Sequence, residues 1–376
     1  MTRRLRVGVV FGGRSGEHEV SLLSARSILD ALDRERYEPV LIGIDHAGRW
    51  HLQDAARALL ETPGAPLHLD PTAPSLAVSP GASLDAGSLV PSGAREAVAQ
   101  VGALDVFFPV VHGTYGEDGT LQGLFEMTGA PYVGSGVLGS SAGMDKDIAR
   151  RLLRDAGLPV VDWLLVRARE RDPDAVAARV AGAFGYPCFV KPANMGSSVG
   201  VSKVRGPAGL AAALARAFRY DTRVVVERGL DVRELECAVL GNERPEASVL
   251  GEVSPTHEFY SYEAKYLDEH GASLEIPARV SDEQSQEARQ MAVRAFEALD
   301  LAGLARVDFF LERGTGRWYV NEVNTLPGFT RISMYPKLWE ATGLSYRALV
   351  DRLLTLALER HGARRALSTR YTPDDP

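Results

Sequence analysis

The chain has 376 residues, of which 45% are hydrophobic and 24% charged, and its net charge is −7. This length is too great for one ordinary core and predicts two or three domains of a soluble globular protein. No block of basic residues stands out, which argues against a nucleic-acid partner, and no apolar run approaches the length of a membrane span. Two cysteines in apolar segments form no disulfide framework or zinc motif, which predicts a reducing, cytoplasmic compartment.

The first part of the chain predicts a parallel α/β domain. Residues 6–11 form an apolar strand that ends at two glycines, and apolar residues from Leu22 to Leu32 then follow helical spacing. Residues 39–44 form a second apolar strand. This strand–helix–strand order predicts a parallel sheet with binding loops at the carboxyl ends of its strands.

Three further segments complete the predicted first domain. Residues 61–97 are rich in Pro, Ala, Gly and Ser, so we expect a long surface insertion that could hold a hairpin. Residues 105–113 form another apolar strand, and residues 131–136 are expected to form the last one. The first domain is therefore predicted to cover residues 1–136.

The remainder of the chain predicts two α+β domains. A helix over 145–156 opens the central domain, 137–229, in which the strands "DWLLV", "PCFVKP" and "RVVVERGL" surround a helix over 210–218. The C-terminal domain, 230–376, contains the strands "RELECAVLG", "SVLGEVSP", "ARVDFFLE" and "RWYVNEVNT", which predict a mostly antiparallel sheet. Helices over 282–299 and 346–361 interrupt and close this domain, and a tail without packing signal follows.

The segment Gly196-Ser197-Ser198-Val199-Gly200 fits two different patterns. It matches the G-x-S-x-G elbow of serine hydrolases, and it matches a loop whose backbone N–H groups surround a phosphate. An elbow requires a strand that runs directly into the first glycine and a helix that follows. Here Pro192-Ala193-Asn194-Met195 intervene and "VSKV" predicts another strand, so the context favours a phosphate-covering lid with Lys191 at its base. The elbow stays an alternative, with His257 and His270 available as partners.

A phosphate lid implies magnesium, which prefers oxygen ligands. Asp308 lies within one predicted strand, and Arg306 points to the same face because it is two residues away. Glu322 and Asn324 lie two apart on another strand. We expect these side chains to converge as a two-metal site for nucleotide phosphates, beside a cationic group. A P-loop motif is absent from the sequence, which excludes that class of nucleotide site.

Six long motifs in order resemble those of one family. They are "VVFGGRSGEHEVS", "VVHGTYGEDGTLQG", "YVGSGVLGSSAGMDK", "KPANMGSSVGVSKV", "FYSYEAKY" and "NEVNTLPGFT". Together they resemble the ATP-grasp superfamily and, within it, the D-alanine–D-alanine ligase family. The resemblance covers about residues 5–360, apart from the insertion.

The resemblance implies an α/β enzyme of ATP-grasp fold, in which a parallel α/β N-terminal domain precedes two α+β domains that sandwich ATP. It implies that two D-alanines are joined through a D-alanyl phosphate to supply peptidoglycan synthesis in the cytoplasm. It further implies two Mg²⁺ ions, for which Mn²⁺ can substitute, a monovalent cation such as K⁺, and a homodimer with no membrane partner.

The resemblance also implies roles for the substrate-site residues. Glu17 would hold the ammonium of the first D-alanine, and His112 would face the same site. Arg306 and Gly328 would form the oxyanion environment. Ser333 and Met334 would meet the carboxylate of the second D-alanine; Met334 is Leu in many relatives.

The nucleotide residues follow in the same way. The positions that the resemblance assigns to the ATP phosphates are Lys146, Lys191, Ser198 and Lys265, and those near adenine and ribose are Glu227, Arg228 and Glu234. Many relatives have Lys at the position of Arg228. Asp308, Glu322 and Asn324 would hold the metal ions.

Tyr266 bears on the choice of acceptor. By resemblance, its phenol bonds to Ser197, which reaches Glu17, and this set marks enzymes that make only the dipeptide. Enzymes that accept D-lactate carry a different residue at the tyrosine position. We therefore expect D-alanine as the acceptor, with D-lactate as the alternative. A nucleotide-binding module without catalysis is a further alternative, but it predicts a missing metal ligand or a broken lid.

Overall fold

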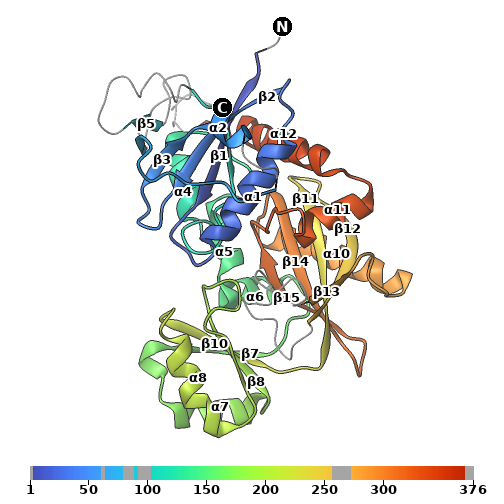
Figure 1. The fold of residues 1–376 in the computed structure, drawn as a ribbon. Coiled ribbons are helices and arrows are strands. Elements are labelled where there is room, and N and C mark those ends of the chain that lie inside the picture. The colour runs from blue at the N-terminus through green and yellow to red at the C-terminus, as the bar shows by residue number, and fades with distance from the viewer. Residues whose placement is uncertain (1–2, 61–63, 79–88, 92–102, 256–271, 369–376) are drawn as a thin grey trace, which may run out of the picture.

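The computed structural model describes residues 3–60, 64–78, 89–91, 103–255 and 272–368 (Figure 1). These residues form three sheets, each with its own helices. Figure 1 shows the six-stranded and five-stranded sheets close together, with the four-stranded sheet and its helices set apart below them. Among the described residues, no helix combines the length and apolarity that a membrane span requires.

The first sheet has the strand order β5-β4-β3-β2-β1-β6. Its strands are β1 (Leu5–Gly12), β2 (Tyr37–Ile44), β3 (Trp50–Gln53), β4 (Ser75–Val78), β5 (Leu89–Pro91) and β6 (Val106–Pro109). β1 pairs in parallel with β2 and with β6, which confirms the predicted parallel pairing, whereas β3, β4 and β5 extend the sheet as antiparallel strands. The helices of this unit are α1 (His18–Ala31), α2 (Ala55–Leu60) and α4 (Thr120–Thr128).

Two predictions for this sheet need correction. The strand expected over residues 105–113 ends at Pro109, because the chain then turns into the loop that carries His112. The strand expected over 131–136 is only an isolated bridge between Tyr132 and Phe107. The predicted insertion contains β4 and β5, which pair as antiparallel strands on the β3 edge, so its described part does include a hairpin-like pair.

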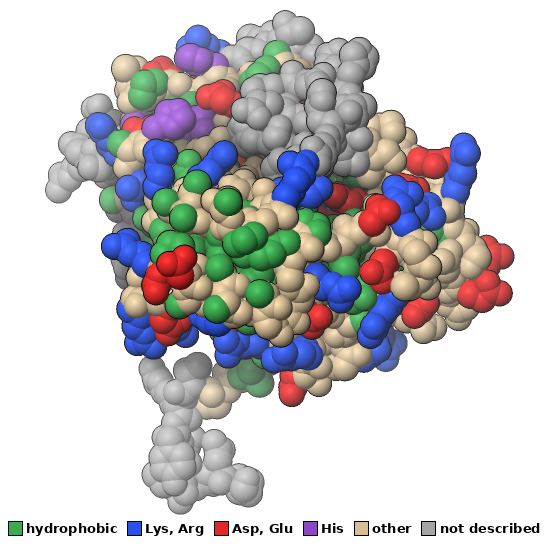
Figure 2. Space-filling view, turned by 90° about the horizontal axis from the view of Figure 1, so that it is seen from below, with side chains coloured by type: hydrophobic (Ala, Val, Ile, Leu, Met, Phe, Trp, Pro, Cys, Tyr) green, Lys and Arg blue, Asp and Glu red, His purple; other side chains and the backbone are tan. Residues whose placement is uncertain are grey.

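The second sheet has the antiparallel order β7-β10-β8-β9. Its strands are β7 (Trp163–Arg167), β8 (Cys188–Pro192), β9 (Ser202–Val204) and β10 (Arg223–Arg228), and its helices are α7 (Pro173–Ala183) and α8 (Leu210–Ala217). Helix α7, which was not predicted from the sequence, begins with Pro173 after the N-capping residue Asp172. Figure 2 views this unit from below, with apolar side chains surrounded by charges of both signs.

The third sheet has the order β13-β12-β11-β14-β15. Its strands are β11 (Val232–Gly241), β12 (Glu246–Pro255), β13 (Ala272–Glu275), β14 (Gly303–Glu312) and β15 (Trp318–Asn324), all antiparallel. The helices that follow or cross it are α10 (Asp282–Ala298), α11 (Met334–Thr342) and α12 (Tyr346–Arg365). The four strands expected in this region are therefore confirmed, and α12 is longer than expected.

Two helices connect the units. α5 (Val137–Met144) and α6 (Lys146–Asp155) follow the first sheet in the chain. Ala149 and Leu153 of α6 share a hydrophobic core with the third sheet, whereas the second sheet has a separate core with α7 and α8. The four-stranded unit thus has a core of its own, and polar contacts at the start of α6 are among those that join it to the rest.

One core also joins the first and third units. Phe329, which is 1% exposed, contacts Phe108 from the first unit and the rings of Tyr335 and Tyr346 from the third, with ring centroids 5.6–5.9 Å apart. Burial of aromatic rings from both units against one another fixes their relative position.

We predict that Phe329→Ala destabilises the protein by about 3–5 kcal/mol, because it removes a ring that fills this joint core. Ile332→Ala is the matched control, since Ile332 lies three residues away and is 73% exposed. Denaturant unfolding of both variants is the measurement. Equal, small effects in the two variants would show that Phe329 does not hold the units together.

Candidate functional site

Three carboxylates lie side by side across the third sheet. Asp308 on β14 is paired in register with Glu236 on β11 and with Glu322 on β15. Opposed residues of antiparallel strands project from the same face, so the three form one row. Arg306 and Asn324 are opposed to each other one step along this face. The register thus brings together every residue predicted to hold metal, and it adds Glu236.

Arg306 is the cation within this group. Its guanidinium donates to both carboxylate oxygens of Asp308, at 2.6 and 2.7 Å, and lies 2.9 Å from Glu236. Burial alone would lower the pKa of Arg306, but Asp308, Glu236 and Glu322 outweigh it and raise the pKa well above its usual range. Arg306 is therefore a permanent positive charge.

The group fits a divalent cation. Like charges directly opposite on neighbouring strands are destabilising, and here three carboxylates face one guanidinium. A magnesium ion would add positive charge beside the carboxylates, and carboxylate and amide oxygens are its preferred ligands. Both Asp308 oxygens are bonded to Arg306, so a metal held by Asp308 competes with Arg306 for them.

A second charged group lies on the four-stranded sheet. Lys191 on β8 donates to both oxygens of Glu227 on β10, at 2.9 and 3.1 Å. Arg150 of α6 also donates to Glu227, and all three side chains are largely buried. Burial would raise the pKa of Glu227, but Arg150 and Lys191 reverse the effect and hold it below its ordinary value. Glu227 is thus an anion shared by two cations.

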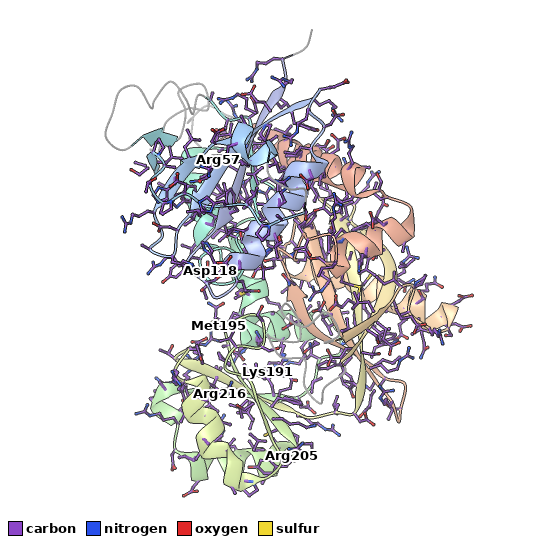
Figure 3. The ribbon with its side chains drawn as sticks, viewed as in Figure 1. Arg57, Asp118, Lys191, Met195, Arg205 and Arg216 are labelled. Carbon is purple, nitrogen blue, oxygen red and sulfur yellow. The ribbon has the colours of Figure 1, made fainter. Side chains whose placement is uncertain are left out.

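Lys146, the first residue of α6, lies between the two groups. Burial lowers its pKa, and the charges that act on it include Glu322 from the third sheet and Lys191 and Glu227 from the second. Its ammonium donates at 2.6 Å to the carbonyl of Met195. Met195 lies in the loop between β8 and β9, residues 193–201, which is called the lid loop. Figure 3 shows Met195 and Lys191 on the side of the four-stranded unit that faces the remainder of the chain.

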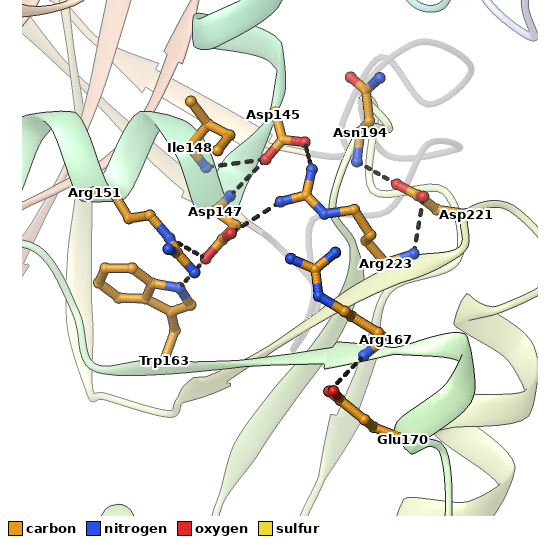
Figure 4. Close-up of polar contacts among 10 residues, drawn as sticks. All are labelled: Asp145, Asp147, Ile148, Arg151, Trp163, Arg167, Glu170, Asn194, Asp221 and Arg223. Carbon is orange, nitrogen blue, oxygen red and sulfur yellow. Dashed lines mark hydrogen bonds and ion pairs between the residues drawn. The ribbon is translucent and has the colours of Figure 1, made fainter.

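A polar network fixes the start of α6 (Figure 4). Asp145 caps the helix by accepting from the N–H groups of Asp147 and Ile148. Arg223 on β10 pairs with Asp145 and, at 2.9 Å, with Asp147. Because this network joins the helix cap to the second sheet, it determines where Lys146 stands relative to Lys191.

The lid loop turns sharply before β9. Ser197 and Ser198 have φ of +49° and +58°, and Gly200 has φ of +74°. A Cβ at Gly200 would lie 2.7 Å from the ring of Tyr220, so this position requires glycine for both reasons. The loop leads into strand β9 and not into a helix, so the hydrolase-elbow alternative is wrong.

The lid reaches the first unit through Glu17. The hydroxyl of Ser197 donates to a carboxylate oxygen of Glu17, which is the residue before α1. Gly113 and Gly196 lie against the same carboxylate, since a Cβ on either would come within 2.8 and 3.4 Å of its Oε2 atom. Glu17 and Ser197, predicted to act together, are therefore in direct contact.

His112 is completely engaged by protein groups. Its Nδ1 donates to the carbonyl of Leu326 at 3.2 Å, and its Nε2 lies 3.1 Å from the hydroxyl of Ser24. Ser24 in turn accepts from the N–H of Phe329 at 3.3 Å. Burial lowers the pKa of His112, so the ring stays neutral. His112 ties the first unit to the loop before α11.

That loop carries the remaining predicted substrate residues. Ser333 is the N-cap of α11, and its hydroxyl accepts from the N–H of Thr330 at 3.0 Å. A Cβ at Gly328 would lie 3.0 Å from the Ser333 hydroxyl, so the two residues are in close contact. The side chain of Met334 packs in the core at 6% exposure. Only the backbone of Met334, in the first turn of α11, is placed to meet a carboxylate.

The remaining predicted residues lie elsewhere. Arg228 follows Glu227 on the same strand, so its side chain points to the opposite face, where it lies 4.0 Å from Asp162. Glu234 is two residues before Glu236 on β11 and shares its face. Lys265 and Tyr266 lie outside the described residues.

Sequence reasoning missed Glu117. Its carboxyl is 7% exposed and accepts from the N–H of Gly113 at 2.8 Å, while its Oε1 atom has no hydrogen-bond partner among the described residues. Burial and the charge of Glu17 raise its pKa well above the usual range, so the group is held neutral. The "GEDG" motif gave no sign of this burial.

We predict that Glu117→Gln changes the pH dependence of stability. With a raised pKa in the folded state, Glu117 keeps its proton while the unfolded chain loses it, so stability falls as the pH rises above about 4.3. Gln cannot ionise, and it keeps the bond from Gly113. Denaturant unfolding between pH 5 and 8, without metal or nucleotide, should show a flatter profile for the variant. Parallel profiles would mean that Glu117 ionises normally.

Comparisons with known proteins agree with this arrangement. Residues 6–135 match the family profile described as D-ala D-ala ligase N-terminus, and residues 152–355 match D-ala D-ala ligase C-terminus. The chain is 53% identical to D-alanine--D-alanine ligase A of Chromobacterium violaceum over 371 residues, which cover 97% of this chain and 98% of that protein. It is 50% identical to the enzyme of the same name from Salmonella typhimurium, with 97% and 99% covered.

Solved structures give the same result. The D-alanine-D-alanine ligase of Coxiella burnetii superposes with a TM-score of 0.85 at 38% identity, covering 97% of both chains. The VanG D-Ala:D-Ser ligase of Enterococcus faecalis superposes with a TM-score of 0.82 at 34% identity, covering 94% of this chain and 100% of that one. The ATP-grasp fold expected from the sequence is thereby confirmed. The chain belongs to the D-alanine–D-alanine ligase family.

Proposed function

We propose that this protein joins two D-alanine molecules into D-alanyl-D-alanine with ATP as the driving substrate, through a D-alanyl phosphate. Its relatives at about half identity over the full chain are ligases of this name. The structural observation that carries the proposal is the row of Glu236, Asp308 and Glu322 beside Arg306, with Lys146 between this row and the Lys191–Glu227 pair. Excess negative charge on one side and lysines on the other suit a magnesium–nucleotide complex.

Asp308, Glu322 and Asn324 would hold two Mg²⁺ ions, and Mn²⁺ would fit the same oxygen ligands. The ions would neutralise charge on the phosphates during transfer. Arg306 would add a fixed cation beside the reacting carboxyl group, with Gly328 completing the oxyanion environment. The ion pairs of Arg306 with Glu236 and Asp308 hold its guanidinium in place before substrate binds.

The nucleotide would be bound from the side of the four-stranded unit. Lys146 and Lys191 would bind the phosphates, and Lys265 would reach the transferring phosphoryl group. The lid residue Ser198 would add a hydroxyl donor. Glu227 and Glu234 would lie toward adenine and ribose, while Arg228 would contribute only through its backbone. Because Arg150 also neutralises Glu227, Lys191 is not its sole counter-ion and keeps charge available for phosphate.

The two D-alanines would bind on either side of Arg306. Glu17 would accept the ammonium of the first, with Ser197 fixing the carboxylate and His112 positioning the loop beside it. The carboxylate of the second would lie at Ser333, where the positive end of α11 has no side-chain cap among the described residues.

Further features follow from the same reaction. The product would supply peptidoglycan synthesis and so cell shape, and the enzyme would act in the cytoplasm, where ATP is available. We propose a K⁺ requirement and a homodimer, and functional domains with limits at 1–136, 137–229 and 230–376. D-Alanine is the proposed acceptor; the comparisons do not favour D-lactate, and the related D-Ala:D-Ser ligase is less similar in sequence.

The metal assignment is tested by Glu322→Gln. Loss of one charged ligand should lower the turnover number about 10²–10³-fold at saturating Mg²⁺, since the site must balance nucleotide charge. Steady-state ADP release in the presence of D-alanine is the measurement. Without Mg²⁺ the variant should be at least as stable as the wild type, because it removes one of three adjacent like charges.

Glu312→Gln is the matched control, because Glu312 ends β14, the strand beside that of Glu322, at the end remote from the Arg306–Asn324 pair. It should keep normal turnover. If Glu322→Gln is also active at saturating Mg²⁺, the metal assignment is wrong.

The acceptor assignment is tested at Tyr266. We predict that the wild-type enzyme makes D-Ala–D-Ala almost exclusively at neutral pH, because by resemblance the phenol of Tyr266 would bond to Ser197, which reaches Glu17. Tyr266→Phe should gain D-Ala–D-lactate synthesis, most visibly at low pH, where the amine of D-alanine is more fully protonated. Product ratios with both acceptors between pH 6 and 9 decide the matter. If a folded Tyr266→Phe variant gives the same ratio of dipeptide to D-Ala–D-lactate as the wild type, Tyr266 does not determine the choice of acceptor.

A further inference from the structure

A group of metal-ligating side chains lies at the carboxyl ends of β1 and β2. His18 and Glu19 are the first two residues of α1, and His46 lies in the turn that follows β2. One ligand atom from each of these three side chains lies within 4.8 Å of the others. The reaction proposed above uses none of them.

His18 is held in one orientation by the backbone. Its ring is 6% exposed, and its Nδ1 lies 2.8 Å from the carbonyl of Gly13. A carbonyl can only accept, so Nδ1 carries the proton and Nε2 of the neutral ring presents its lone pair. An Nδ1–H bonded to a backbone carbonyl is the arrangement that usually orients a histidine for a metal. Gly12 fixes the ring further, since a Cβ there would lie 3.1 Å from its Cε1 atom.

The other two ligands are available. The His46 ring stacks on His18 with centroids 3.9 Å apart, and within the described part of the chain neither His46 nor Glu19 forms a hydrogen bond or ion pair. Both are exposed, so they can rotate toward Nε2 of His18. The nearby Asp45 is already engaged, because it accepts from the N–H of Arg49 at 2.8 Å and lies 3.2 Å from Nε2 of His51.

We propose that His18, Glu19 and His46 bind one zinc-class divalent ion, at a site separate from the proposed magnesium ligands. Two imidazoles and one carboxylate are a ligand set for Zn²⁺ with a fourth position left open, and imidazole nitrogen disfavours Mg²⁺. The positive end of α1 opposes a cation, and the carboxylate of Glu19 offsets this effect. The ion would connect the turn after β2 to the start of α1.

The test is a zinc titration of the complete, nucleotide-free protein against a chromogenic zinc chelator. The wild type should bind one Zn²⁺ per chain, with no competition from millimolar Mg²⁺. His46→Ala should weaken binding by at least about tenfold, which is the lower range for loss of a group that supports a metal site. Glu19→Gln should weaken it as well. X-ray absorption should show zinc–nitrogen distances of about 2.0–2.1 Å.

His68→Ala is the matched control, because His68 is an exposed histidine of the same unit outside the group. It should bind zinc as the wild type does. If His46→Ala and Glu19→Gln also bind zinc unchanged, or if the wild type binds no zinc, the proposal is overturned. If His68→Ala weakens zinc binding as much as His46→Ala does, zinc binds to scattered surface histidines and the proposal is also overturned.

Discussion

The row of Glu236, Asp308 and Glu322 is the constraint around which the site is organised. Strand register places these three carboxylates next to one another, where they repel, and the guanidinium of Arg306 lies against Glu236 and Asp308. A sheet that is otherwise built for stability would place neutral or oppositely charged residues there. A divalent cation bound between the carboxylates would offset their repulsion. The repulsion is then a local loss of stability that is retained because the site needs these ligands.

The other units are arranged around this row. The charges of Glu322, Lys191 and Glu227 all act on Lys146, and its ammonium donates to the carbonyl of Met195 in the lid. The lid in turn contacts Glu17 of the first unit through Ser197. One chain of polar contacts therefore links all three sheets, while apolar packing around Phe329 joins only the first and third. The four-stranded unit has its own core, and these polar contacts connect it to the other two units.

Much of this could be predicted from the sequence, for identifiable reasons. Residues two apart on a strand share a face. The sequence alone therefore predicts that Arg306 lies beside Asp308, and that Glu322 lies beside Asn324. Glu236 could not be found in that way, because its place depends on the register between β11 and β14, which are distant in the chain.

Other features were hidden because they depend on burial. Glu117 and Arg150 look like surface charges of a loop and a helix, yet both are buried in the folded protein. Helix α7 has only Val176 and Val180 as buried residues, too few for a clear apolar period. Residues 131–136 resemble a strand, but only Tyr132 pairs with a neighbouring strand.

The central claim is that the carboxylate row is a divalent metal site for a nucleotide. The most direct measurement is a crystal structure with Mn²⁺ and ADP, in which anomalous scattering locates the metal. Two anomalous peaks within coordination distance of Asp308, Glu322 and Asn324, with Arg306 displaced from at least one Asp308 oxygen, are the predicted result. Peaks elsewhere, with nucleotide bound and both Arg306–Asp308 bonds unchanged, would contradict the account.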